Sequence, residues 1–349
     1  MKIKIYTDCP VKLYYQGVYS IEEDIELVGT RFLYYSMIKL NNRFKFLRKL
    51  TRRGEIKNEP VSGIWRSFSA PFRLLFCKNI VLPVTACRNI VYYLLLLKLL
   101  RKNLIFHSAW PYHGEKYIEE PKLWNKFFWK LFFRNIKAIG NTRKATEGLR
   151  SVGARAYYIP HSVETSIFKP KEKDNKKPVV LYVGRLNEAK GIKSILKLAD
   201  KFNKEAKFVF VGSGPLENEV RNNKNVEFLG EINDRKELAE VYRNSDIFIL
   251  NSYKTPEWEE IFGRVLIEAM SSGLAVISTD CIGPKEIIRD GENGFLIEQK
   301  NDRQLLEKFN ILLKDKKLRE KMGKNAREDA LEKYDIKKIS EKWLEVIKK

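Results

Sequence analysis

The sequence predicts an α/β protein of two domains, each built on a parallel β-sheet covered by helices. Two observations lead to this prediction. First, the second half of the chain alternates short β-branched or aromatic runs with helix-like segments, which is typical of βαβ units. Second, 349 residues with 44% hydrophobic content are enough to bury two separate cores.

Strands are predicted wherever a short apolar run ends at turn residues. In the second half the predicted strands are 178–184, 206–212, 225–230, 246–252, 274–279 and 294–298. The first half has a noisier pattern, and its predicted strands are 2–6, 103–107, 136–140 and 156–160. Because the second set alternates with helices, we expect a parallel sheet that is covered on both faces.

A polar stretch flanked by prolines, "KPKEKDNKKP", separates the two halves and has the composition of an interdomain linker. We therefore predict an N-terminal domain over 1–168, a linker over 169–178 and a second domain over 179–330. The remaining segment, 331–349, is predicted to form an amphipathic helix. Its apolar residues at helical spacing are Ile336, Ile339, Trp343 and Ile347.

The net charge of +22 is concentrated in the first half of the chain. Residues 1–170 hold 30 Lys and Arg against 12 Asp and Glu, whereas residues 171–349 hold 36 against 32. This imbalance indicates that the first half faces an anionic partner. We do not expect that partner to be a nucleic acid, because the sequence has no RNA-stacking or helix-turn-helix pattern. A basic nucleic-acid-binding protein remains the alternative interpretation.

Two basic, partly aromatic segments, 41–54 and 122–137, favour an anionic membrane surface as that partner. A helix over 122–137 would gather its cations within about 120° of the helical wheel. These cations are Lys122, Lys126, Lys130, Arg134 and Lys137. The opposite side would hold Trp124, Phe127, Phe128, Leu131 and Phe132. Such a helix is typical of a membrane interface, and the alternative is a helix packed on its own sheet with a solvated lysine edge.

Cysteine usage and hydropathy predict a cytoplasmic protein. The four cysteines show no Cys-x-x-Cys spacing, which suits a reducing compartment and argues against a zinc site. The opening residues alternate like a first strand and do not resemble a signal peptide. The most apolar run, 89–100, is too short to cross a bilayer and contains Lys98.

A loop bounded by glycines leaves the first strand of the second half and carries two cations, Arg185 and Lys190. Cations on such a loop are suited to holding a diphosphate, and the alternative is a solvated basic loop. Further along, Gly212 and Gly214 begin a Gly-x-Gly-x-x-Gly whose last position is Glu217. We interpret this broken dinucleotide fingerprint as a tight turn between a strand and a helix.

Two acids flank the start of a predicted helix in "EEIFGRVLIEAM", residues 259–270. The helix should begin near Phe262–Gly263 and run towards Gly273, so Glu260 precedes it and Glu268 lies inside it, away from the core-facing stripe. The free N–H groups of the first turn and the helix dipole form an anion site beside Glu260. A sugar nucleotide needs this arrangement; the alternative is a capping glutamate and a surface glutamate.

The order of these motifs resembles the donor half of glycosyltransferase family 4, also known as glycosyl transferases group 1. The resemblance depends on "VGRLNEAKG", "VGSGP", "PEWEEIFGRVLIEAMSSGLAVIST" and "GPKEIIRDGENGFLI", and it is dense over about 150–300. It implies a retaining enzyme of the GT-B fold, in which two Rossmann-like domains face each other across a cleft. It also implies that the last helix returns to the N-terminal domain.

The resemblance implies a role for each matching residue. Arg185 and Lys190 would hold the departing diphosphate, Glu260 the hydroxyls of the donor sugar and Glu268 the ribose, while His107 would reach the transferring sugar. His113 is a secondary candidate for that last role. The remaining donor-binding positions would be Gly17, Gly184, Leu229, Gly230, Ile261, Phe262, Gly263 and Val265.

Two departures from the family pattern concern the N-terminal side. Gly17 stands alone where the family often has a glycine pair, and His161-Ser162 replaces the usual Asn-Gly. The chain also has no Asp-x-Asp, so we expect no metal and no cofactor. The predicted function is transfer of a sugar from a UDP- or GDP-linked donor to a lipid-linked or polysaccharide acceptor, at the inner face of the cell membrane. An inactive sugar-nucleotide sensor is the second alternative.

Overall fold

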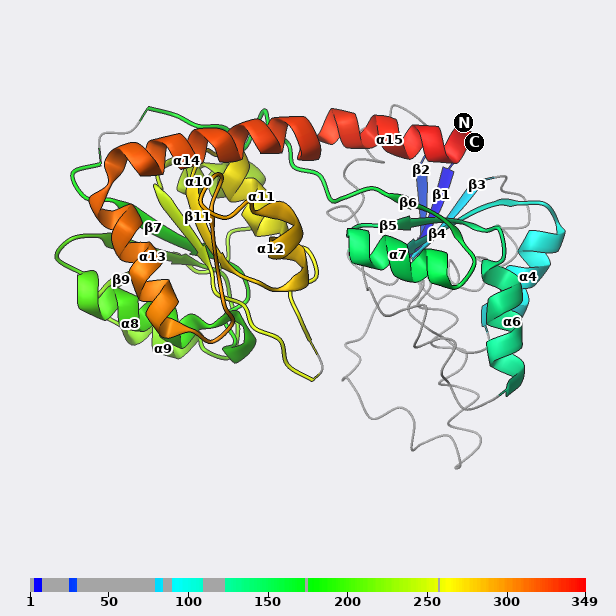
Figure 1. Cartoon of the computed structure of the whole chain (residues 1–349), viewed down its shortest axis with the longest axis horizontal. Coiled ribbons are helices and arrows are strands. Elements are labelled where there is room, and N and C mark those ends of the chain that lie inside the picture. The colour runs from blue at the N-terminus through cyan, green and yellow to red at the C-terminus, as the bar shows by residue number, and fades with distance from the viewer. Residues whose placement is uncertain are drawn as a thin grey trace, which may run out of the picture. The chain divides into compact units, whose positions relative to one another are not determined.

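The computed structural model describes residues 3–7, 25–29, 79–83, 90–108, 123–172, 175–256 and 258–349. It divides the chain into two compact units. Unit 1 comprises Met1–Ile159 together with Ser340–Lys349, and unit 2 comprises Pro160–Ile339. Each unit holds one six-stranded sheet whose paired strands are all parallel (Figure 1).

The sheet of unit 2 has the strand order β12-β11-β10-β7-β8-β9. Its strands are β7 (Val179–Val183), β8 (Lys207–Val211), β9 (Val226–Phe228), β10 (Ile247–Leu250), β11 (Ala275–Thr279) and β12 (Phe295–Ile297). Counted from β7, this is the order of a Rossmann fold, which reverses its direction of growth between the first strand and the fourth. The switch point therefore lies between β7 and β10, which are neighbours in the sheet.

Helices cover both faces of this sheet (Figure 1). They are α8 (Ile192–Phe202), α9 (Glu217–Asn222), α10 (Arg235–Arg243), α11 (Arg264–Ser271), α12 (Ile282–Ile287), α13 (Asp302–Lys314) and α14 (Lys316–Asp329). Alternate residues of each strand enter opposite cores: Val180 and Tyr182 pack with α8 and α13, whereas Leu181 and Val183 pack with α10 and α11. Burial on both faces explains why these strands read as nearly continuous apolar runs.

The sheet of unit 1 has the order β2-β1-β3-β4-β5-β6. Its strands are β1 (Ile3–Thr7), β2 (Ile25–Gly29), β3 (Asn79–Pro83), β4 (Asn103–Ser108), β5 (Lys137–Gly140) and β6 (Arg155–Tyr158). The helices described here are α4 (Ile90–Leu99), α6 (Leu123–Phe133) and α7 (Arg143–Ser151). An aromatic cluster joins β4 to α6, in which the ring of Phe106 lies edge-on to those of Phe132 and Phe133.

The last helix, α15 (Ile336–Lys348), belongs to unit 1 from Ser340 onwards. The Asn103 side chain donates to the carbonyl of Ile347 at 2.7 Å, and the Trp343 ring packs on His107 with centroids 5.5 Å apart. Ile339, Trp343 and Ile347 are all buried, as expected from their helical spacing.

Residues 169–178 lie inside unit 2, and the division between the units falls between Ile159 and Pro160. This differs from the linker predicted by composition. The Asn175 side chain donates to the carbonyl of Asn244 at 3.1 Å and to the Asp246 carboxylate at 2.8 Å. Because these hydrogen bonds tie the polar stretch to unit 2, polarity and prolines alone misplace the boundary.

Among the helices that the structure describes, none is both long enough and apolar enough to cross a bilayer.

Glycines align where β7, β8 and β9 end and bring their loops into backbone contact. The N–H of Gly184 donates to the carbonyl of Val211 at 3.0 Å, and that of Gly212 donates to the carbonyl of Gly230 at 2.8 Å. A Cβ on Gly212 would lie 1.9 Å from the Gly184 oxygen, and one on Gly214 would lie 2.4 Å from the Leu186 oxygen. Close approach of two loops therefore explains this Gly-x-Gly.

We expect Gly212→Ala to destabilise unit 2 by about 3 kcal/mol, because its φ of +139° and the clash with Gly184 act together. Gly291→Ala is the matched control: its φ of +76° costs about 1 kcal/mol, but its Cβ meets no atom within 4 Å. Thermal unfolding followed by circular dichroism measures both. Equal midpoints for the two variants would contradict the proposed close approach.

Candidate active site

The loop between β7 and α8 is held against the end of β10. The N–H of Tyr253 donates to the carbonyl of Ala189 at 2.8 Å, and a Cβ on Gly191 would lie 2.2 Å from the Asn251 oxygen. Within the loop, the Asn187 side chain accepts from the N–H of Lys190 at 3.2 Å. These contacts place Lys190 beside the residues that follow β10, at the switch point of the sheet.

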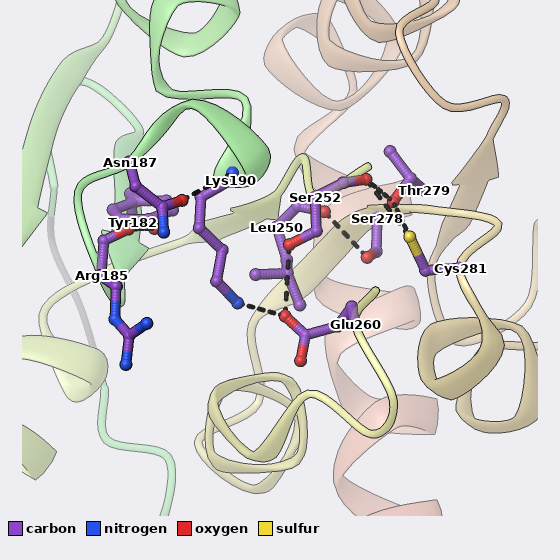
Figure 2. A network of polar contacts seen from close by, with 10 residues as sticks. All are labelled: Tyr182, Arg185, Asn187, Lys190, Leu250, Ser252, Glu260, Ser278, Thr279 and Cys281. Atoms are coloured by element: carbon purple, nitrogen blue, oxygen red, sulfur yellow. Dashed lines mark hydrogen bonds and ion pairs between the residues drawn. The ribbon is translucent and has the colours of Figure 1, made fainter. Parts of the chain in front are cut away.

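Lys190 and Glu260 form an ion pair at this point (Figure 2). The same carboxylate oxygen accepts from the Ser252 hydroxyl at 3.2 Å. The Lys190 ammonium lies 4.5 Å from the centroid of the Trp258 ring, within the range of a cation–π interaction. The side chains of Lys190 and Glu260 are only 14% and 12% exposed, so each charge depends on the other for most of its stabilisation.

The neighbouring acid Glu259 has a different role. It is buried, and its carboxylate accepts from the N–H of Ile282 at 3.2 Å, which caps the start of α12. The two adjacent glutamates therefore face different partners, and only Glu260 meets the loop that carries the cations.

Arg185 is exposed, and its side chain makes no hydrogen bond or ion pair with any residue described in the structure. Its backbone is fixed, since the Tyr182 hydroxyl donates to the Arg185 carbonyl at 2.8 Å. Burial, and then the charge of Glu260, raise the pKa of Tyr182 well above its ordinary value, so this hydroxyl stays protonated. Figure 2 shows the Arg185 and Lys190 side chains extending to the same side of the loop, where an anion can meet both.

The start of α11 is held by packing around Phe262. Its ring lies edge-on to His161, with centroids 4.9 Å apart, and a Cβ on Gly283 would lie 2.3 Å from the Phe262 Cα. Gly263 is the N-cap residue, has φ +84° and offers no capping side chain. The first turn of α11 therefore keeps backbone N–H groups that can bind an anion. Those groups belong to Gly263, Arg264 and Val265.

Glu268 lies within α11 and is buried, so the alternative interpretation of a surface glutamate is wrong. Its carboxylate accepts from Arg235 at 3.1 Å and from the Tyr242 hydroxyl at 3.2 Å, and Arg264 is 3.8 Å away. Burial, and then the Glu268 charge, raise the pKa of Tyr242 far above its usual value, so it remains a donor. A helical wheel omits these partners because two of the three come from α10.

Leu229 and Gly230 follow β9 at the same edge of the sheet as the cations. The N–H of Leu229 donates to the carbonyl of Phe210 at 3.0 Å, and the Leu229 side chain remains partly exposed. Gly230 has φ +72°, with open space where a Cβ would lie. This turn therefore offers backbone and apolar surface beside the cationic loop.

A family model matches much of unit 2. It is described as "Glycosyl transferases group 1" and covers residues 163–329, which include Arg185, Lys190, Glu260 and Glu268. Residues 163–329 therefore resemble this family, in agreement with the resemblance of the motifs.

One curated relative is the N,N'-diacetylbacillosaminyl-diphospho-undecaprenol alpha-1,3-N-acetylgalactosaminyltransferase of Campylobacter jejuni. It is 37% identical over 178 residues, which are 49% of this chain and 45% of that protein. The spore coat protein SA of Bacillus subtilis is 32% identical over 50% of this chain and 49% of its own length. The chain thus spans about half the length of the curated relatives it matches.

A solved structure is similar over the whole chain. HepE of Anabaena in complex with UDP-glucose superposes with a TM-score of 0.71, covering 100% of this chain and 99% of that one at 17% identity. At this identity the comparison concerns the fold alone. The predicted α/β class and the GT-B fold are confirmed.

His107, expected to reach the transferring sugar, is buried in β4 against Trp343 of α15. Burial lowers its pKa to about 4, so the ring is neutral at physiological pH. His107 thus packs in the interior of unit 1. Gly17 and His113, the other two N-terminal candidates, lie outside the described residues, and so does the segment 41–54.

Four contributors to the site were not predicted from the sequence: Tyr182, Ser252, Trp258 and Arg235. Ser252 ends a predicted strand at its carboxyl end, and Trp258 lies in the quoted motif beside Glu260, so position alone could have indicated both. Nothing local marks Tyr182 or Arg235. Their roles come from contacts with residues that are distant in the sequence.

We expect the free energy of unfolding to fall by about 3 kcal/mol as the pH falls from about 6.5 to about 4, through His107 alone. In this window the unfolded chain binds a proton at His107 whereas the folded chain does not, so acid favours unfolding.

Urea unfolding at several pH values, for the wild type and His107→Asn, measures this contribution. The variant should be less stable at pH 7 but lose less stability on acidification. If the free energy of unfolding falls with pH by the same amount in both proteins, His107 is not held neutral by burial.

Proposed function

We propose that this protein is a retaining, metal-independent glycosyltransferase that moves a hexosyl-type sugar from a nucleotide-diphosphate sugar to an acceptor hydroxyl. The observation that supports this most directly is the Lys190–Glu260 pair beside Arg185, at the switch point of a Rossmann-type sheet. Two cations on one loop suit a diphosphate, and a carboxylate next to them suits sugar hydroxyls.

On this proposal Lys190 exchanges its partner when the donor binds. In the donor-free chain its charge is balanced by Glu260. A bound diphosphate would take that place together with Arg185 and the N–H groups at the start of α11. Glu260, still hydrogen-bonded to Ser252, would then accept from the donor sugar's hydroxyls. As the bond from sugar to phosphate breaks, these cations and dipoles would stabilise the charge that develops on the departing diphosphate.

Glu268 is proposed to hold the ribose. Its neighbour Arg235 keeps the Nε and Nη2 N–H groups buried without hydrogen-bond partners among the residues that the structure describes. A buried N–H without a partner is costly, and a ribose hydroxyl or base oxygen would satisfy it. The Leu229–Gly230 turn would lie beside the base.

We propose that the anomeric configuration is retained and that no metal is needed, because of the charged groups at the candidate site. Transfer on one face of the sugar requires no second carboxylate as nucleophile, since the departing phosphate can take the proton of the acceptor hydroxyl. The positive charge that a metal would supply can come from Arg185, Lys190 and the helix start. The sequence also has no Asp-x-Asp.

The acceptor is proposed to be lipid-linked or a growing polysaccharide, at the inner face of the cell membrane. The name of the Campylobacter relative specifies a diphospho-undecaprenol acceptor, and the first 170 residues here carry most of the net positive charge. For the donor, a UDP- or GDP-linked sugar is proposed, and HepE was solved with UDP-glucose.

A panel of UDP- and GDP-linked sugars, scored for nucleotide release with and without a polyprenyl-diphosphate-linked acceptor, tests the proposal. Transfer should persist in EDTA, and NMR of the product should show the anomeric configuration of the donor. A chain that binds donors but turns none over would be a sensor, and the proposal would fail.

Glu260→Gln should lower transfer by at least about a hundredfold, because the amide loses the charge that pairs with Lys190 and orients the sugar. Glu259→Gln is the control: its amide oxygen still caps α12, so turnover should change by less than about threefold. Initial rates at saturating donor measure both. The role of Glu260 would be wrong if the two variants were equally active.

Arg185→Ala should weaken UDP binding by about tenfold or more while changing the affinity for uridine little, because hydrogen bonds to charged groups contribute about 1.5–3 kcal/mol. Lys193→Ala, in the first turn of α8 and paired with Glu188, is the matched cation and should change neither affinity. Isothermal titration calorimetry gives both constants. An equal loss for UDP and uridine would place Arg185 away from the diphosphate.

A further inference from the structure

Helices α4 and α6 of unit 1 lie side by side (Figure 1). The Lys98 ammonium, near the end of α4, donates to the last carbonyls of α6: those of Leu131 at 2.9 Å, Phe132 at 2.9 Å and Arg134 at 2.6 Å. Burial, and then the charge of Arg134, lower the pKa of Lys98. The carboxyl ends of the two helices therefore lie together and are joined by the half-buried amine of Lys98.

The inner side of α6 fits the alternative interpretation of a helix packed on its own sheet. Trp129, Phe132 and Phe133 are buried in the core of unit 1, and Lys130 and Arg134 are exposed. The helix ends at Phe133, and Lys137 begins β5, so Lys137 cannot belong to a helical cationic face. The helix predicted over 122–137 is therefore wrong in its length.

The outer side of the two helices is apolar. Eight large hydrophobic side chains in the described part of the chain are strongly exposed, and five of them lie here. They are Leu96 (45% exposed), Leu99 (80%), Leu100 (49%), Phe127 (59%) and Leu131 (42%). We call these five residues the α4–α6 surface. Isolated exposed leucines need no explanation, but five on two adjacent helices form a contiguous feature.

The described chain segments that form and flank this surface are rich in cations. Residues 90–108 and 123–146 contain no Asp or Glu. The cations in these ranges are Lys98, Arg101, Lys102, Lys126, Lys130, Arg134, Lys137, Arg143 and Lys144. Arg101, Lys130 and Arg134 are exposed beside the apolar residues. Apolar side chains whose neighbours in these ranges carry only positive charges fit a partner with an apolar interior and an anionic surface.

We propose that the α4–α6 surface docks on an anionic lipid bilayer, with Leu99 and Phe127 entering the acyl region and the cations at headgroup level. This rests on the proposed function, since an enzyme whose acceptor is lipid-linked must meet a bilayer. Four of the five apolar residues are leucines, which offer no stacking surface to nucleobases. Within residues 90–108 and 123–146 there is no acid that could supply the negative charges of a mixed-charge protein interface. Insertion of apolar groups and attraction to anionic headgroups then act together.

Flotation with vesicles tests this proposal on the full-length chain, using phosphatidylcholine alone and an equal mixture of phosphatidylcholine and phosphatidylglycerol. The wild type should float with the mixed vesicles and much less with the neutral ones. The double variant Leu99→Ser/Phe127→Ser should lose about tenfold or more in bound fraction. Lys130→Gln/Arg134→Gln should lose the preference for anionic vesicles.

The matched control is Ile311→Ser/Leu331→Ser, which removes two exposed apolar side chains of unit 2 and should float like the wild type. Thermal midpoints confirm that each variant folds. Unchanged flotation of Leu99→Ser/Phe127→Ser would overturn the proposal, and so would a wild type that ignores vesicles but binds RNA or self-associates through this surface.

Donor hydrolysis in solution, assayed on the same samples, separates the two proposals. If donors are hydrolysed but the surface variants float like the wild type, the docking surface is rejected and the proposed enzymatic function is retained. Flotation that depends on Leu99 and Phe127, without hydrolysis of any donor in the panel, would keep the docking surface and reject the proposed enzymatic function.

Discussion

One ion pair, between Lys190 and Glu260, joins the two loops on which the candidate site is built. Lys190 arrives from the loop after β7 and Glu260 from the segment after β10, two strands that are neighbours only because the sheet reverses its order there. Both side chains are largely removed from water, so neither charge is stable without a counter-charge. The pair therefore holds the two loops in register.

The ion pair depends in turn on backbone contacts that side chains would prevent. Gly191 lies against Asn251, and Gly212 lies against Gly184, so the cationic loop has almost no freedom relative to β8 and β10. Phe262 plays the same part for the other loop by fixing the start of α11 between His161 and Gly283. Charged groups are thus positioned by rigid, close-packed backbone, which limits the reorganisation needed when a diphosphate arrives.

The local sequence pattern was sufficient to predict the sheet of unit 2 and the cations of the loop after β7. Strands buried on both faces appear as apolar runs, and turns bounded by glycines are recognisable in a sequence. It missed β2 and β3, which are short strands in the noisier half. It also could not show which residues contact Glu268 and Phe132, since a helical wheel reports only the helix to which a residue belongs. The partners of Glu268 are Arg235 and Tyr242 on α10, and the partners of Phe132 are Phe106 and Trp129. Contacts between distant segments decide such cases.

The two units also differ in how strongly their chemistry constrains the amino-acid sequence. The family match covers 163–329, which holds every residue placed around the ion pair, whereas the fold of unit 1 is shared with HepE at low identity. A parallel sheet requires only apolar strands and covering helices, so many sequences can build it. A diphosphate and a sugar, by contrast, require particular charges at particular strand ends. Helices α4 and α6 of unit 1 carry cations and no acids, which fits the proposal that unit 1 meets the acceptor while unit 2 binds the donor.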